Sequence, residues 1–180
     1  AFTELDRRIP LRNVEAGEYE GLVVTRGKAL ESEKGYAVSE NLGKTLRTHQ
    51  VDGVNLAVAA IDNYGGFVLA DGTGAGKTMQ ELAVARHYAD KGNSVLIVTP
   101  NRTIIDTVFR KDAGTLGVKL NVLEGSNQEV KPRTISVTTY ASLEKVKGTP
   151  DYVIFDEAHY LKNYHSKQSR LGVRLATNAK

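Results

Sequence analysis

A glycine-rich string between an apolar run and a helical segment constrains this fold more than any other feature. Residues 67–70 (Phe-Val-Leu-Ala) form a short continuous apolar run, which is typical of a buried strand in a parallel sheet. Glycines follow at Gly72, Gly74 and Gly76, and residues 77–90 then predict a helix. A strand, a tight loop and a helix in this order predict the start of an α/β domain.

The rest of the chain repeats this alternation. Further helices are predicted at residues 47–63, around 103–111 and at 166–176. Further strands are predicted at residues 95–98, 120–123, 134–138 and 152–155. The pattern predicts an α/β domain with a mostly parallel central sheet covered on both faces. Residues 1–45 lack this regularity and are predicted to be a lead-in segment ahead of a domain of residues 46–180.

The glycine string has the composition of a phosphate-binding loop. Its glycines let the backbone turn N–H groups toward phosphate oxygens, and the helix that follows adds the positive end of its dipole. Lys77 is expected to reach the terminal phosphates, and the Thr78 hydroxyl is expected to bind Mg²⁺. The predicted nucleotide-binding residues of this loop are Gly72, Thr73, Gly74, Ala75, Gly76, Lys77 and Thr78.

Two departures bear on that interpretation. Asp71 stands where the strict phosphate-loop pattern has glycine, so a plain glycine turn followed by a chance Lys-Thr pair is the alternative. A dinucleotide-binding Rossmann fold requires glycine where Lys77 stands, and the sequence therefore excludes it.

Two carboxylates follow the last predicted strand. A nucleoside triphosphate with Mg²⁺ needs one carboxylate near the metal and a second group that orients or deprotonates the attacking water. Asp156 suits the first role and Glu157 the second. His159 lacks a histidine at metal-ligand spacing and is interpreted either as a polar switch beside the nucleotide or as a structural residue.

Composition excludes several classes of protein. The chain has no cysteine, which excludes disulfides, thiolate catalysis and cysteine-ligated zinc. No apolar run is long enough to span a bilayer, so a membrane protein is not expected. The net charge of +3 is compatible with a polyanionic partner. An intracellular location is expected, in cytoplasm or nucleus, and a bacterial or viral origin is equally open.

Together these motifs resemble a known family. Residues 156–159 are a DEAH box, and the motif series resembles the first RecA-like lobe of superfamily-two helicases, most closely the Swi/Snf-like branch of double-stranded-DNA translocases. The resemblance is carried by residues 46–54, 70–80, 95–100, 138–140 and 156–167. The Asp-Gly-Thr-Gly opening of the loop is also similar to that of strawberry-notch-like helicases, so the sub-branch stays open.

The resemblance implies a RecA-like, three-layer P-loop NTPase fold that uses ATP and Mg²⁺. It implies that Gln50 contacts the adenine, that Lys77, Asp156 and Glu157 are catalytic, and that Thr78 and Asp156 bind the metal. The residues implied to lie along the nucleic-acid backbone, with double-stranded DNA as the expected partner, are Thr99, Pro100, Thr138 and Thr139.

The expected function is the ATP-binding lobe of an ATP-dependent DNA helicase or translocase. Nothing after residue 167 resembles motif III or a second RecA-like lobe, which in this family supplies an arginine finger. The resemblance therefore implies a second lobe in the full-length protein and weak or absent ATP hydrolysis by this chain alone. Two alternatives stay open: a P-loop ATPase or kinase unrelated to nucleic acid, and a non-catalytic nucleic-acid-binding scaffold.

Overall fold

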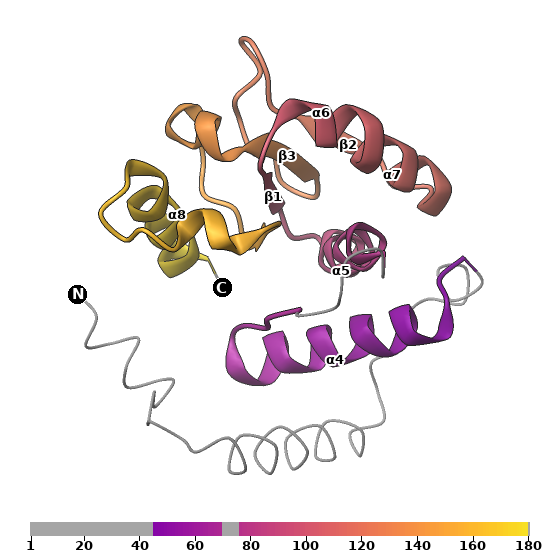
Figure 1. The fold of residues 1–180 in the computed structure, drawn as a ribbon. Helices are drawn as coiled ribbons and strands as arrows, with labels where there is room; N and C mark the ends of the chain where they lie inside the picture. Colours follow the sequence, from indigo (N-terminus) through magenta and orange to yellow (C-terminus); the bar gives the residue numbers. More distant parts are fainter. Residues whose placement is uncertain (1–44, 70–75, 180) are drawn as a thin grey trace. The chain divides into compact units, whose positions relative to one another are not determined.

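A computed structural model describes residues 45–69 and 76–179, and a four-stranded sheet lies at their centre (Figure 1). Its strands run in the order β2-β3-β1-β4, and all three pairings are parallel. The strands are β1 (Val95–Thr99), β2 (Leu120–Val122), β3 (Ile135–Thr139) and β4 (Tyr152–Phe155). The predicted α/β class with a parallel sheet is confirmed.

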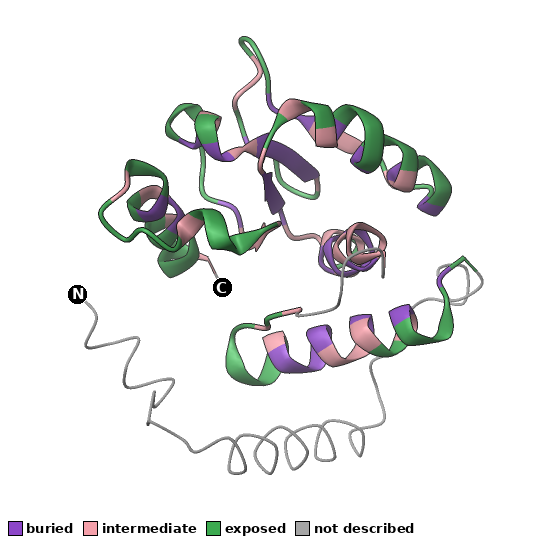
Figure 2. Cartoon of the chain, in the orientation of Figure 1, coloured by how far each residue is buried: buried purple, intermediate pink, exposed green. Residues whose placement is uncertain are grey.

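The centre of the sheet is β1, which lies between β3 and β4. Its four apolar residues, 95–98, are fully buried, as Figure 2 shows for β1 and β3. A strand covered on both faces has no polar side to present, and for that reason its sequence is continuously apolar instead of alternating. Val98 pairs with Thr138 on one side and with Phe155 on the other.

Helices cover the two faces. They are α4 (Thr48–Tyr64), α5 (Lys77–Asp90), α6 (Arg102–Ile104), α7 (Arg110–Leu116) and α8 (Lys167–Asn178), with shorter helical turns η1 (Ile105–Phe109), η2 (Tyr140–Lys145) and η3 (Ala158–Leu161). Helix α5 packs against β1, β3 and β4, and α4 packs against α5.

The two faces of β4 meet different helices. Tyr152 stacks on Tyr88 of α5, with ring centroids 3.8 Å apart. Val153 and Phe155 point the other way and join a core cluster that includes Leu171 of α8. Because successive side chains of a strand alternate between faces, α5 and α8 lie on opposite sides of the sheet at β4.

Most predicted elements form within a residue or two of their expected bounds, but residues 67–69 do not form the predicted strand. Val68 is 84% exposed. A strand needs a neighbour to satisfy its backbone N–H and C=O groups, and in the described part of the chain residues 67–69 pair with none. Ala70, the last residue of the predicted run, lies outside the described residues.

The predicted helix at 103–111 is longer than expected. It runs through α6, η1 and α7, and η1 is a π-helical turn. Gly117 ends it in the left-handed conformation, with φ of 65°. Among residues 45–69 and 76–179, no helix combines the length and the apolar character needed to cross a membrane.

Candidate nucleotide site at the edge of β4

A cleft of about 550 Å³ runs along the outer edge of β4 and brings the predicted catalytic residues together. Lys77, the first residue of α5, lines it with Asp156 and Glu157, which follow β4 directly. Residues 65–69 also line it. The lysine after the phosphate loop and the acidic pair therefore face the same space at the carboxyl end of a parallel strand, where α/β sheets bind ligands.

The end of the phosphate loop is held by Gln50. Residues Gly72, Thr73, Gly74 and Ala75 lie outside the described residues, but Gly76 caps α5 in a left-handed conformation, with φ of 77°. The Gln50 Nε2 donates to the Gly76 carbonyl at 3.3 Å, and its Oε1 accepts from the Arg47 N–H at 2.9 Å. Gln50, the predicted adenine contact, is thus buried against the loop.

Replacing Gly76 with alanine is expected to destabilise the fold. A Cβ there would lie 2.2 Å from Gln50 Nε2. The left-handed backbone alone costs a non-glycine residue about 1–2 kcal/mol. We expect urea denaturation, followed by circular dichroism, to give a free energy of unfolding lower by at least that amount.

Gly114→Ala is the matched control. Gly114 lies inside α7, and a Cβ there meets nothing within 4 Å. Alanine is the better helix former by about 0.5–1 kcal/mol, so this variant is expected to be at least as stable as the parent. Equal stabilities for the two variants would contradict the close packing of Gly76 on Gln50.

Asp156 is held by its neighbours and desolvated. The Thr99 hydroxyl donates to Asp156 Oδ2 at 3.0 Å. Burial raises the pKa of Asp156 above its ordinary value; the Thr99 hydrogen bond and Lys77 oppose the rise, and Glu157 adds to it. A desolvated carboxylate next to a second carboxylate favours the binding of a cation, because the cation would stabilise the charged form of both groups.

Glu157 has an unusual backbone for a non-glycine residue. Its φ is 52° and its ψ is 53°, and left-handed residues of this kind cluster at functional sites. Its Oε2 lies 3.2 Å from His159 Nδ1. Both side chains are exposed, at 45% for Glu157 and 62% for His159. Glu157 therefore presents its carboxylate to solvent where the cleft opens, and His159 is not a core residue.

The side chains present fit Mg²⁺. Mg²⁺ is usually held by one or two carboxylates together with substrate phosphates and water. Asp156 and the Thr78 hydroxyl are oxygen donors of that kind. Within the described ranges, no three His, Cys, Asp or Glu side chains cluster as an all-protein metal site would require. The donor set thus suits a metal that arrives with a nucleotide.

A third carboxylate, Glu81, also lines the cleft and was not predicted from the sequence. Its Oε2 is buried without a hydrogen-bond partner. Burial and, secondarily, the charge of Asp156 raise the pKa of Glu81 to about 8, against the opposing effect of Lys77. The signal that could have found it is spacing, because residues four apart on a helix share a face and Glu81 follows Lys77 by four.

The predicted nucleic-acid residues divide into two kinds. Thr99 and Thr138 are 0% and 1% exposed, so their hydroxyls lie inside the sheet. Pro100 and Thr139 are partly exposed. The side chains of Pro100 and Thr139 are therefore accessible at the strand ends, and those of the two buried threonines are not.

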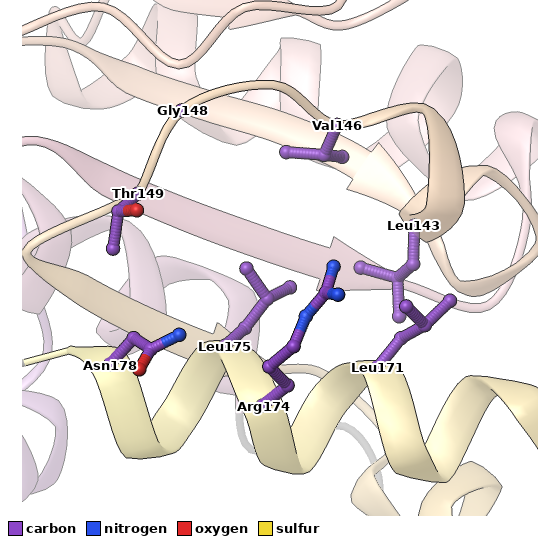
Figure 3. Close-up of a pocket in the computed structure, with 8 residues that line it drawn as sticks. All are labelled: Leu143, Val146, Gly148, Thr149, Leu171, Arg174, Leu175 and Asn178. Atoms are coloured by element: carbon purple, nitrogen blue, oxygen red, sulfur yellow. The ribbon is translucent and has the colours of Figure 1, made fainter.

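A second, smaller cavity of about 270 Å³ shares no lining residue with this cleft. Side chains of α8 project into it toward the segment between η2 and β4 (Figure 3). Its lining residues are Leu143, Val146, Gly148, Thr149, Leu171, Arg174, Leu175 and Asn178. None of these belongs to the predicted nucleotide or nucleic-acid sites.

Comparisons with known proteins place the chain in a family. The family model described as "Type III restriction enzyme, res subunit" matches residues 43–173. The SWI/SNF-related matrix-associated actin-dependent regulator of chromatin subfamily A-like protein 1 of Xenopus tropicalis is 29% identical over 150 residues, which are 79% of this chain and 16% of that protein. The ATP-dependent helicase brm of Drosophila melanogaster is 28% identical over 145 residues, 71% of this chain and 9% of that protein.

A solved structure is similar as well. The Sulfolobus solfataricus SWI2/SNF2 ATPase core in complex with dsDNA matches with a TM-score of 0.57 and 25% identity. The match covers 70% of this chain and 29% of that one. The chain therefore spans less than a third of each of these relatives.

Proposed function

The chain belongs to the res-subunit family of type III restriction enzymes, and from that premise we propose that it is the ATP-binding lobe of a DNA motor. Within superfamily two, it is a first RecA-like lobe of the Swi/Snf-like branch. In the full-length protein, ATP hydrolysis drives movement along nucleic acid. One observation carries the proposal: Lys77 at the start of α5 and Asp156–Glu157 after β4 line one cleft.

The residues of the cleft divide the work. The backbone of residues 72–76 and the Lys77 ammonium receive the phosphates, and Gln50 contacts the adenine. Thr78 and Asp156 would hold Mg²⁺, and the metal would supply neutralisation of the phosphate charge. Glu157 orients the attacking water and accepts its proton.

Double-stranded DNA is the proposed partner. The Sulfolobus relative is an ATPase core in complex with dsDNA. In this chain α8 carries Lys167, Arg170 and Arg174 and no acidic residue, which gives this helix a positive charge that suits a phosphate backbone. Pro100 and Thr139 are the proposed contacts at the strand ends. We expect the protein to act where DNA is, inside a cell or nucleus.

A second RecA-like lobe is proposed to complete the site. An arginine supplied from outside a nucleotide site changes hydrolysis by about 10³–10⁵-fold in related phosphoryl-transfer systems. The 180-residue chain alone is therefore expected to hydrolyse ATP slowly or not at all. Phosphate release measured on the isolated chain and on the full-length protein checks this, and equal, fast turnover by both would contradict the need for a second lobe.

The proposed function is tested by ATP hydrolysis in the full-length protein with and without double-stranded DNA. DNA is expected to raise the rate, and the effect is expected to weaken as salt increases, because the contacts are to phosphates. Equal rates with DNA, RNA and no nucleic acid would exclude the motor. A phosphorylated small molecule in place of free phosphate would favour a kinase, and undetectable ATP binding would favour a scaffold.

A further inference from the structure

Asp156 is held from both faces of the sheet, by Thr99 of the neighbouring strand β1 and by Tyr140 of η2, the turn that follows β3. The register pairs Val98 with Phe155, so Thr99 and Asp156 are the next residues along their strands. The Asp156 N–H donates to the Val98 carbonyl at 2.9 Å, which extends the ladder by one bond beyond β4. Thr99 and Asp156 therefore lie side by side on the face of the sheet that α5 covers.

On that face the contact is to the carboxylate. Thr99 is fully buried, and its hydroxyl donates to Asp156 Oδ2 at 3.0 Å. A β-branched side chain on a strand has few rotamers, so the hydroxyl is held in place by its own backbone. A fixed donor on one carboxylate oxygen restricts rotation of the group.

On the opposite face the contact is to the backbone. Tyr140 follows β3 and belongs to the core cluster on the α8 side. Its hydroxyl donates to the Asp156 carbonyl at 2.8 Å. Its ring stacks on Tyr160 of η3, with centroids 5.3 Å apart and planes 7° from parallel. Tyr140 thus fixes the chain at Asp156 and again four residues later.

We propose that Thr99 and Tyr140 are positioning residues that hold the Asp156 carboxylate in the orientation that binds Mg²⁺. The proposal rests on the function proposed above, because it assumes that Asp156 is the metal carboxylate. Thr99 acts on the side chain and Tyr140 on the backbone. This assigns both residues a role in the nucleotide site in place of the nucleic-acid contact expected for Thr99. A metal ligand held by such outer partners binds its metal more tightly than a free one.

The chain offers a matched control for Thr99. Thr138 lies on the adjacent strand β3, is 1% exposed, and its hydroxyl has no hydrogen-bond partner. Thr99→Val and Thr138→Val therefore make the same chemical change at the same depth, and only the first removes a bond to Asp156. Thr99→Ser keeps the hydroxyl and tests whether the hydroxyl is what matters.

The experiment measures Mg²⁺ dependence in the full-length protein. A fluorescent ADP analogue is titrated with Mg²⁺ present and with EDTA, and the Mg²⁺ concentration for half-maximal ATP hydrolysis is measured separately. For Thr99→Val we expect unchanged affinity for the ADP analogue in EDTA and a half-maximal Mg²⁺ concentration about 10- to 150-fold higher, as for the loss of a hydrogen bond to a charged group. Tyr140→Phe keeps the ring stack, and we expect it to raise the half-maximal Mg²⁺ concentration by a smaller factor.

The half-maximal Mg²⁺ concentrations of Thr138→Val and Thr99→Ser are expected to stay close to that of the parent protein. Equal Mg²⁺ dependence in Thr99→Val and Thr138→Val would overturn the role of Thr99. A half-maximal concentration in Thr99→Ser as high as in Thr99→Val would overturn it too. No shift in Tyr140→Phe would overturn the role of Tyr140. A parent protein that binds no nucleotide would instead remove the proposed function, so the two failures are distinguished.

Discussion

Replacing Glu157 with glutamine in the full-length protein is expected to lower the rate of ATP hydrolysis by about 10²–10⁴-fold, the usual contribution of a positioned general base. Glutamine keeps the shape of the side chain but cannot accept the proton of the attacking water. Nucleotide binding is expected to persist, because Lys77 and Asp156 still receive the phosphates and the metal. Steady-state hydrolysis and equilibrium binding of a fluorescent ADP analogue separate the two effects.

Glu129→Gln serves as the control for this experiment. Glu129 is an exposed residue that does not line the cleft. Its loss is expected to leave hydrolysis close to that of the parent protein. Hydrolysis by Glu157→Gln within a few-fold of the parent would show that another group activates the water.

Replacing Glu81 with glutamine is expected to make the stability of the nucleotide-free chain less dependent on pH. The folded-state pKa of about 8 lies above the ordinary value of 4.5, so the folded chain holds a proton that the unfolded chain releases. The stability that this protonated carboxyl contributes is complete below pH 4.5 and is lost as the pH rises through 8. Glutamine is neutral at every pH, so the Glu81→Gln variant keeps this contribution to stability as the pH rises.

The size of that effect follows from the shift. Each pKa unit is worth about 1.4 kcal/mol, and the pKa rises from 4.5 to about 8, so we expect the free energy of unfolding of Glu81→Gln to exceed that of the parent at pH 9 by on the order of 5 kcal/mol, with little difference at pH 4.5. Urea denaturation of the chain in EDTA at the two pH values measures this difference in the free energy of unfolding. The exposed Glu129, replaced in the same way, is expected to show no such difference. A gain that is the same at both pH values would contradict a protonated, buried Glu81.

Local pattern was enough to predict several elements. The expected helix at 77–90 and strand at 152–155 coincide with α5 and β4, because helical spacing and continuous apolar runs are properties of neighbouring residues. The meeting of Lys77 with Asp156 and Glu157 was expected because the carboxyl ends of parallel strands share one edge of the sheet. The structure brings the three residues together through the start of α5 and the end of β4, although residues 67–69 form no strand.

Features that depend on pairing between distant segments were not predictable. Residues 67–69 have the composition of a strand, but composition does not say whether a partner is present to bond with them. The bond from Thr99 to Asp156 depends on the register of β1 on β4, and local sequence does not fix that register. The local sequence around Glu81 is that of an ordinary helix, and only the packing of α5 shows that its side chain lines the cleft.

The outer side of β4 has a consequence for handling the molecule. Along it, the main-chain groups of Tyr152–Phe155 meet no strand of the described ranges, and the side chains of this segment are only half-buried. Residues 65–69 line the cleft along this edge. Because strand edges that nothing covers pair with extended peptides, including the same edge of another copy, substitutions that displace residues 65–69 are expected to favour self-association in concentrated preparations.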